Sequence, residues 1–130
     1  MDRRDGIANL DLDRIAAAMA ETSAEFQPRG VTMATPTWLD MDATWPYTLV
    51  TDRSEISRPR SIGITFQGPG DSEGVIVVYA GGWADVDVVH IDDRVTTEYV
   101  EIDYPTDFRT TLTRVFTELI AKPPQRRSPR

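Results

Sequence analysis

Cysteine and histidine are almost absent from this 130-residue sequence, which contains no cysteine and a single histidine, His90. Without cysteine, the chain cannot form disulfides, use a thiolate nucleophile, or bind zinc or an iron–sulfur cluster through sulfur. One histidine is too few for a multi-histidine metal site or an imidazole relay. We therefore expect no metal and no other cofactor.

Long hydrophobic runs and positive charge are also scarce. No apolar segment reaches the ~20 residues that a membrane span needs, and the N-terminal residues lack the pattern of a signal peptide. The 21 Asp and Glu residues outnumber the 14 Lys and Arg residues, which gives a net charge of −7. Because nucleic acids and anionic membranes attract Lys and Arg, we expect neither as a partner. The balance favours a cytoplasmic protein that binds a basic protein, or one whose charge only keeps it in solution.

The segment Gly74–Tyr104 is the richest in β-branched and aromatic residues. Val75–Tyr79 is a continuous apolar run, which predicts a buried central strand. Trp83–Ile91 alternates and predicts a second strand. Its core face would carry Ala84, Val86, Val88 and His90. The Asp92–Asp93 pair indicates a two-residue turn, after which Arg94–Tyr104 would return as a third strand.

The outward face of this segment is predicted to be strongly acidic, because ten acidic residues and one basic residue occur between positions 71 and 107. With a two-residue turn, Asp87 would lie directly opposite Glu98, on the same outward face as Trp83 and Asp85. Like charges in such positions destabilise a sheet, and attraction of a basic partner would explain them. A register that differs by one residue would instead scatter the charges.

An amphipathic helix is predicted near each end of the chain. The first begins after Asn9 or Asp11, either of which can cap a helix, and it ends at Pro28 and Gly30. Its recurring core-side positions are Leu12, Ile15, Ala16, Met19, Ser23 and Phe26. The second is capped by Thr106 and ends at residues 122–124. Its apolar stripe consists of Phe108, Leu112, Val115, Phe116 and Leu119.

Further strands are predicted at Val31–Thr35, Tyr47–Thr51 and Ser61–Phe66, and Gln67–Gly74 is predicted to be a loop. Together these elements predict an α+β fold, a two-layer sandwich in which a mostly antiparallel sheet of about five or six strands packs with an N-terminal and a C-terminal helix. Residues 1–122 would form a single domain, and residues 123–130 would form a disordered basic tail.

The segment between residues 35 and 47 mixes large aromatic side chains with acidic ones, and it is too polar and too broken by proline for a long regular element. Trp38, Asp40 and Trp45 lie in it. The segment either folds over an open end of the sheet or forms an exposed recognition loop. The second interpretation rests on the preference of interfaces for tryptophan and tyrosine, and on the fit between carboxylates and a partner's Arg or Lys.

A catalytic function has less support. Asp85 and Asp87 share a strand face, but paired carboxylates act as acid and base in a cleft that desolvates one of them. His90 is expected on the core face as a structural residue. A small-molecule-binding or enzymatic domain would need an enclosed pocket lined by His90, Tyr99 and carboxylates.

The sequence YAGGW at Tyr79–Trp83, within a small acidic α+β domain, resembles the tyrosine, glycine-pair and tryptophan pattern of the Imm1-type immunity proteins of bacterial polymorphic toxin systems. The resemblance covers about five residues. It implies a small cytoplasmic protein that binds and blocks a toxin, often a basic nuclease or another secreted effector.

The leading hypothesis is a non-enzymatic immunity- or antitoxin-like inhibitor, a monomer or homodimer, that covers a basic toxin or effector with an acidic surface bearing aromatic residues. The residues expected to form that surface are Trp83, Asp85, Asp87 and Glu98, extended by Trp38, Asp40 and Trp45. One alternative is a secretion-type chaperone or dimeric adaptor that holds an extended protein segment, because chaperones resembling those of type III secretion have a similar small α+β shape. The small-molecule-binding or enzymatic domain is the second alternative.

Overall fold

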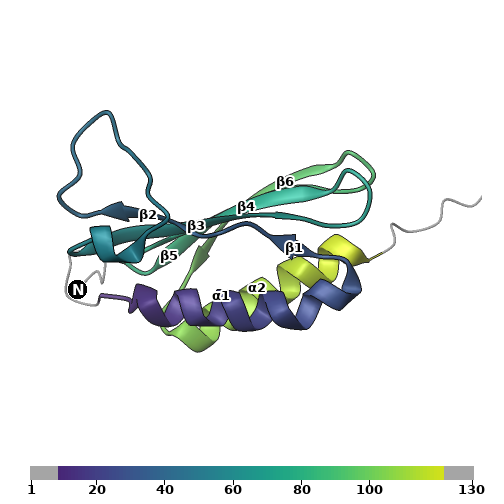
Figure 1. The fold of residues 1–130 in the computed structure, drawn as a ribbon. Coiled ribbons are helices and arrows are strands. Elements are labelled where there is room, and N and C mark those ends of the chain that lie inside the picture. The colour runs from purple at the N-terminus through teal and green to yellow at the C-terminus, as the bar shows by residue number, and fades with distance from the viewer. Residues whose placement is uncertain (1–8, 122–130) are drawn as a thin grey trace, which may run out of the picture.

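Two helices cover one face of a six-stranded antiparallel sheet in the computed structural model, which describes residues 9–121 (Figure 1). The elements are α1 (Leu12–Phe26), the short 3-10 helix η2 (Gln27–Arg29), β1 (Thr32–Met33), β2 (Thr37–Asp40), the 3-10 helix η3 (Arg53–Glu55), β3 (Pro59–Gln67), β4 (Glu73–Tyr79), β5 (Trp83–Val89), β6 (Val95–Glu101) and α2 (Pro105–Ile120). The predicted α+β fold class is confirmed. The predicted basic tail at 123–130 lies outside the described residues.

The sheet is a meander with a divided edge. Strands β3, β4, β5 and β6 follow one another as antiparallel neighbours, and β1 and β2 both pair with the free side of β3. β1 pairs with one end of β3 at Phe66 and Gln67, whereas β2 pairs with the other end from Pro59 to Gly63. The short connections predicted from the sequence therefore produce a sheet in chain order, apart from the two short edge strands.

The first helix begins where the sequence predicts. The side-chain carboxylate of Asp11 accepts hydrogen bonds from the backbone N–H groups of Asp13 and Arg14, at 3.1 and 3.2 Å. This is the capping arrangement that satisfies two of the unpaired donors of a helix N-terminus. Gly30, with φ of +100°, follows η2 in the left-handed conformation that favours glycine and turns the chain toward β1.

The second helix begins two residues earlier than predicted. Its cap is Tyr104, and Pro105 occupies the first helical position, where its missing N–H and fixed φ suit the helix. The carboxylate of Asp107 accepts the backbone N–H of Tyr104 at 2.9 Å. Thr106 therefore lies inside the first turn, and its expected role as the cap was wrong.

One hydrophobic core lies between the helices and the sheet. The two helices lie side by side and run in the same direction (Figure 1), and the ring of Phe116 from α2 meets Phe26 of α1 and Phe66 of β3 edge-on, with ring centroids 5.5 and 5.0 Å apart. The predicted stripe of α2 is buried at every position, and so are Ala84, Val86, Val88 and His90 of the β5 side. The face assignment made from the alternation of Trp83–Ile91 is confirmed.

Three strand predictions need correction. β2 was not predicted, because its four residues carry no alternation long enough to stand out. Tyr47–Thr51 forms no strand, and Val50 contributes only one bridge to Trp38. The run Val75–Tyr79 is central in the sheet but is not buried on both faces, since Val75 is 38% exposed while Ile76 is fully buried.

The turn between β5 and β6 contains three residues, not two. The backbone N–H of Asp93 donates to the carbonyl of His90, the N–H of His90 donates to the carbonyl of Arg94, and Asp93 has φ of +67°. A left-handed residue in the third turn position is typical of three-residue hairpin loops. Ile91 is thus part of the turn, and the pairing of β5 with β6 shifts by one residue from the predicted register.

Candidate partner-binding surface

The face of the sheet opposite the helices is not covered by another described layer (Figure 1), and we call it the open face. Its side chains form four rows that cross the strands. Each row consists of residues that pair across neighbouring strands, named here from the β1–β2 edge of the sheet to β6. The rows are Leu39, Ser61, Tyr79, Trp83 and Glu101; Thr37, Gly63, Val77, Asp85 and Tyr99; Thr65, Val75, Asp87 and Thr97; and Thr32, Gln67, Glu73, Val89 and Val95. The rows contain four carboxylates and neither Lys nor Arg.

An aromatic pair occupies one end of the open face. The rings of Tyr79 and Trp83 are directly paired across β4 and β5 and stack with centroids 4.8 Å apart and planes 15° apart. The Trp83 ring lies against the turn that joins these strands, because a Cβ atom added to Gly81 would be 2.3 Å from Trp83 Cζ3. Gly82 completes the turn with φ of +100°. The two glycines of YAGGW therefore leave room for the tryptophan ring against the turn.

Acidic side chains occupy the middle of the open face. Burial raises the pKa of Tyr79, and the negative charge of the nearby Asp85 carboxylate raises it further. The Thr97 hydroxyl donates to Asp87 Oδ1 at 2.8 Å from the neighbouring strand. Asp87 is thus oriented by a hydroxyl group on the same face, and its second oxygen keeps its acceptor capacity.

The arginines of residues 9–121 form their ion pairs elsewhere. The pairs are Arg53 with Asp13, Arg58 with Asp42, Arg94 with Asp92, Arg109 with Glu21, and Arg114 with both Glu98 and Glu118. None of these pairs includes Glu73, Asp85 or Asp87. These three carboxylates of the open face therefore have no ion-pair partner among the described residues.

A long loop borders the aromatic end. It joins β2 to η3 and rises from the sheet on the side away from the helices (Figure 1). Trp45 in this loop is 82% exposed and meets Tyr47 edge-on at 5.7 Å. The Arg60 guanidinium lies 5.3 Å from the Tyr47 ring centre and is also near enough to Tyr79 to lower its pKa. Arg60 therefore connects the loop aromatics to the Tyr79–Trp83 stack.

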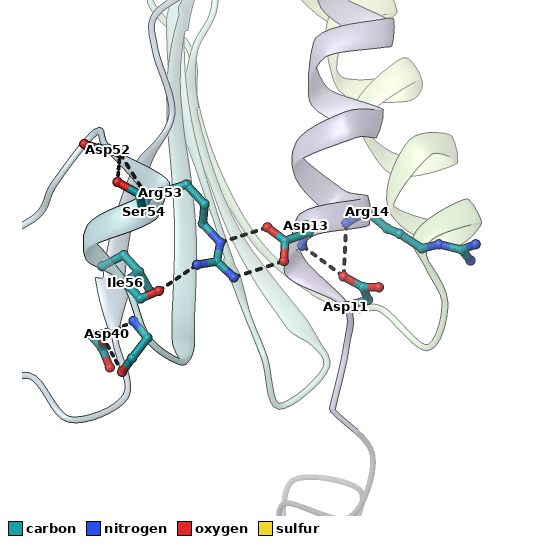
Figure 2. Close-up of polar contacts among 9 residues, drawn as sticks. Asp11, Asp13, Arg14, Asp40, Asp52, Arg53, Ser54 and Ile56 are labelled. Atoms are coloured by element: carbon teal, nitrogen blue, oxygen red, sulfur yellow. Dashed lines mark hydrogen bonds and ion pairs between the residues drawn. The ribbon is translucent and has the colours of Figure 1, made fainter.

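The two ends of this loop are held by side-chain hydrogen bonds. Figure 2 shows Arg53 reaching from η3 to Asp13 of α1, with Nε–Oδ1 and Nη2–Oδ2 distances of 2.8 and 3.0 Å, while its Nη1 donates to the Ile56 carbonyl. At the other end, the backbone N–H groups of Asp42 and Ser57 donate to Asp40 and hold the pKa of its carboxyl below the usual value. The exposed tip of the loop is thus connected to the rest of the fold by hydrogen bonds at both of its ends.

A groove of about 610 Å³ occupies the opposite end of the open face. β1 and the chain just after it form one wall, and Val95 at the start of β6 forms the other. The floor includes Val75 and Val89, with Glu73 and Asp87 between them. Its volume lies within the range of about 300–1,000 Å³ typical of ligand sites.

The structure brings together three of the residues predicted for the binding surface and separates the others. Trp83, Asp85 and Asp87 lie on the open face as predicted, and Trp45 is exposed at the loop tip. Glu98 pairs in register with Val86, so its side chain belongs to the helix-covered face, where it forms an ion pair with Arg114 at 2.8 Å. The expected position of Glu98 opposite Asp87 was wrong, and Thr97 takes that place.

Two further residues predicted for the binding surface, Trp38 and Asp40, already make contacts within the fold. Trp38 is 5% exposed, because its position in β2 faces the core, and Arg53 lies over its ring. Asp40 is engaged by the backbone at the base of the loop, and its second oxygen also accepts from the Ser57 hydroxyl. These contacts leave Trp38 and Asp40 little capacity for a partner.

Sequence reasoning missed Tyr79, Val75 and Val77 as open-face residues. The run VIVVY gave no indication of two different faces because every residue in it is apolar. A signal was available in the alternation of the neighbouring strand, since Asp85 and Asp87 pair with Val77 and Val75. Residues opposite outward carboxylates share their face.

The histidine does not form the pocket that an enzymatic function was expected to need. His90 is buried and its Nε2 lies 3.0 Å from Thr96 Oγ1 on the helix-covered face, whereas Tyr99 lies on the open face. The space beside His90 measures about 10 Å³. Within residues 9–121, no three His, Asp or Glu side chains are grouped so that they could hold a metal ion.

No helix within the described part of the chain is long and apolar enough to cross a membrane. No protein-family model, curated protein or solved structure matches this chain. The functional argument therefore rests on the sequence and on the geometry of the open face.

Proposed function

We propose that this protein is a non-enzymatic inhibitor of the immunity or antitoxin type, which uses the open face of its sheet to cover the basic surface of a toxin or effector protein. The observation that carries the proposal is the combination on one uncovered face of the stacked Tyr79–Trp83 pair with Asp85 and Asp87. The resemblance of YAGGW to immunity proteins is consistent with this use, because the two glycines leave room for the Trp83 ring against the turn.

The two kinds of side chain have different tasks in such a complex. Flat aromatic rings supply contact area with little loss of conformational freedom, and they dominate the affinity of many interfaces. Carboxylates speed the encounter with a basic protein and fix its orientation. The exposed Trp45 would extend the contact from the sheet onto the loop, so that the partner would contact both the open face and the loop.

The chaperone or dimeric-adaptor alternative requires self-association, and the open face is poorly suited to that. A second copy docked face to face would bring Asp85 and Asp87 against carboxylates of the same kind. Like charges at an interface oppose association by several kcal/mol. An inhibitor that binds one folded partner is therefore the better fit to this charge distribution.

The test is capture of partners from a lysate of the native source, followed by purification of the captured protein and measurement of its affinity and activity. We expect a basic protein that binds one to one and loses activity when bound. Asp85→Lys/Asp87→Lys should weaken the purified complex at least about tenfold. Calorimetry and the partner's own activity measure the two effects separately.

One variant matches the change in total charge, and a second changes a charge on the other face of the sheet. Glu25→Lys/Glu55→Lys changes the net charge by the same amount at exposed sites away from the four rows, and Glu98→Lys replaces one acidic residue on the helix-covered face. Both should bind the partner like the wild type. Equal weakening by the two double variants would show that only net charge matters, and binding of several unfolded clients would favour the chaperone.

A further inference from the structure

The groove at the far end of the open face has an alternating floor. Val75 is paired with Asp87 across β4 and β5, and Glu73 is paired with Val89 one row further along. The two valines therefore lie on one diagonal and the two carboxylates on the other. Val95 follows Val89 in the same row and is 66% exposed, so the apolar surface continues up the wall of the groove.

From this pattern we infer that the groove binds an extended segment of the partner in which two basic residues occupy alternate positions, with their aliphatic stems on the valines and their charged ends on Glu73 and Asp87. The inference deepens the proposed function and rests on it for the source of the segment. It names the recognition element that the partner would place at this end of the face.

The spacing supports this choice. Diagonal neighbours on an antiparallel pair are about 7–8 Å apart. Alternate residues of an extended peptide, which point to the same side, repeat about every 6.6–6.8 Å. Basic residues at positions i and i+2 thus match the separation of Glu73 and Asp87, whereas adjacent basic residues point to opposite sides and can place only one charge in the groove.

The chemistry of the lining supports it as well. Lys and Arg bury their methylene stems along apolar surface while their charged ends reach a polar partner. A groove that is apolar on one diagonal and acidic on the other offers both parts of that side chain. Asp87 is held by Thr97 through Oδ1, which leaves Oδ2 for an incoming donor, and neither Glu73 nor Asp87 forms an ion pair within residues 9–121.

Two synthetic peptides of equal composition test the inference on the isolated full chain. One is acetyl-Ser-Arg-Ser-Arg-Ser-amide, and the other is acetyl-Ser-Ser-Arg-Arg-Ser-amide. NMR titration at low ionic strength, read at the methyl groups of Val75, Val89 and Val95, should show that the alternating peptide binds roughly fivefold more tightly. Equal binding of the two peptides, or shifts confined to other parts of the surface, would overturn the inference.

Neutral variants assign the effect to the carboxylates. Glu73→Gln/Asp87→Asn should abolish the difference in affinity between the two peptides. The single variant Glu73→Gln, which keeps Asp87, should reduce that difference. Glu25→Gln/Glu55→Gln removes the same charge elsewhere and should leave the difference intact. A difference that survives in Glu73→Gln/Asp87→Asn would remove the groove carboxylates from the site.

The peptide titration is independent of the capture experiment, so the two proposals can fail separately. Spacing-dependent peptide binding with no captured partner would keep the groove and reject the inhibitor. A captured partner that depends on Asp85 and Asp87, together with peptides that bind equally, would keep the inhibitor and reject the groove.

Discussion

The two faces of the sheet are built from alternate residues of the same strands, yet they differ in almost every respect. In β4, Ile76 and Val78 are fully buried beneath the helices, while Val75 and Val77 on the open face have the same chemistry and no layer above them. The covered face contains the aromatic cluster around Phe116, and the open face combines aromatic rings with the carboxylates of Asp85 and Asp87. The difference teaches that burial by the chain's own helices accounts for only two of the five residues of the apolar run in β4, Ile76 and Val78.

The largest difference between the faces should appear when one methyl-bearing side chain is shortened on each. Ile76→Ala leaves a cavity in the core and should lower the free energy of unfolding by about 2–5 kcal/mol. Val75→Ala, one residue away, should lower it by less than about 1 kcal/mol because the site is already partly in water. Urea denaturation of the two variants measures both values. Similar losses would mean that the open face is covered in solution.

A smaller difference should appear when a methyl group is added to a glycine on each face. A Cβ on Gly74 would lie 2.4 Å from Phe66 Cζ and 2.9 Å from the Asp87 carbonyl, so Gly74→Ala should destabilise the protein by about 1–3 kcal/mol. On the open face, a Cβ on Gly63 would lie 3.4 Å from the nearest atom, Val77 Cγ2. Gly63→Ala should therefore change stability by no more than about 0.5 kcal/mol. Thermal unfolding distinguishes the two, and a marked loss in Gly63→Ala would show that the open face is tightly packed.

The smallest effect concerns Asp40, an acidic residue away from the open face whose carboxylate accepts hydrogen bonds from the backbone. The backbone N–H groups of Asp42 and Ser57 lower the pKa of Asp40 in the folded protein below its ordinary value of 3.8. A lowered folded pKa adds stability that is fully present above the unfolded pKa and is lost as the pH falls through the folded pKa. Asp40→Asn should therefore be less stable than wild type at pH 6, and the gap should narrow below about pH 4. Urea titrations from pH 6 to pH 3 measure this gap, and a constant gap would contradict the assignment.

Much of the fold follows from local patterns in the sequence. The spacing of Phe108, Leu112 and Val115 identified the last helix, and the alternation of Trp83–Ile91 assigned the faces of β5, because both patterns repeat with the period of the element. β2 escaped detection because four residues are too few to establish a period. The start of α2 was misplaced because Pro105 at the first helical position and Thr106 as a cap are both favourable local choices.

The binding surface was less accessible to sequence reasoning, because register depends on one residue in a turn. Asp93 adopts the left-handed conformation usually taken by glycine, and the Asp92 side chain accepts the N–H of Arg94 at 3.2 Å within the same turn. That choice moved Glu98 to the covered face. The VIVVY run by itself also could not show which face of β4 the helices cover, since all five of its residues are apolar.

The three-residue turn between β5 and β6 has a genetic consequence. Deletion of the single codon for Ile91 would leave His90 and Arg94 as the pair that closes a two-residue turn, so β5 and β6 would keep their register. Thr97 would remain opposite Asp87, and Glu98 and Val100 would remain on the helix-covered face. The length of this turn can thus change by one in-frame codon while the open face presents the same side chains.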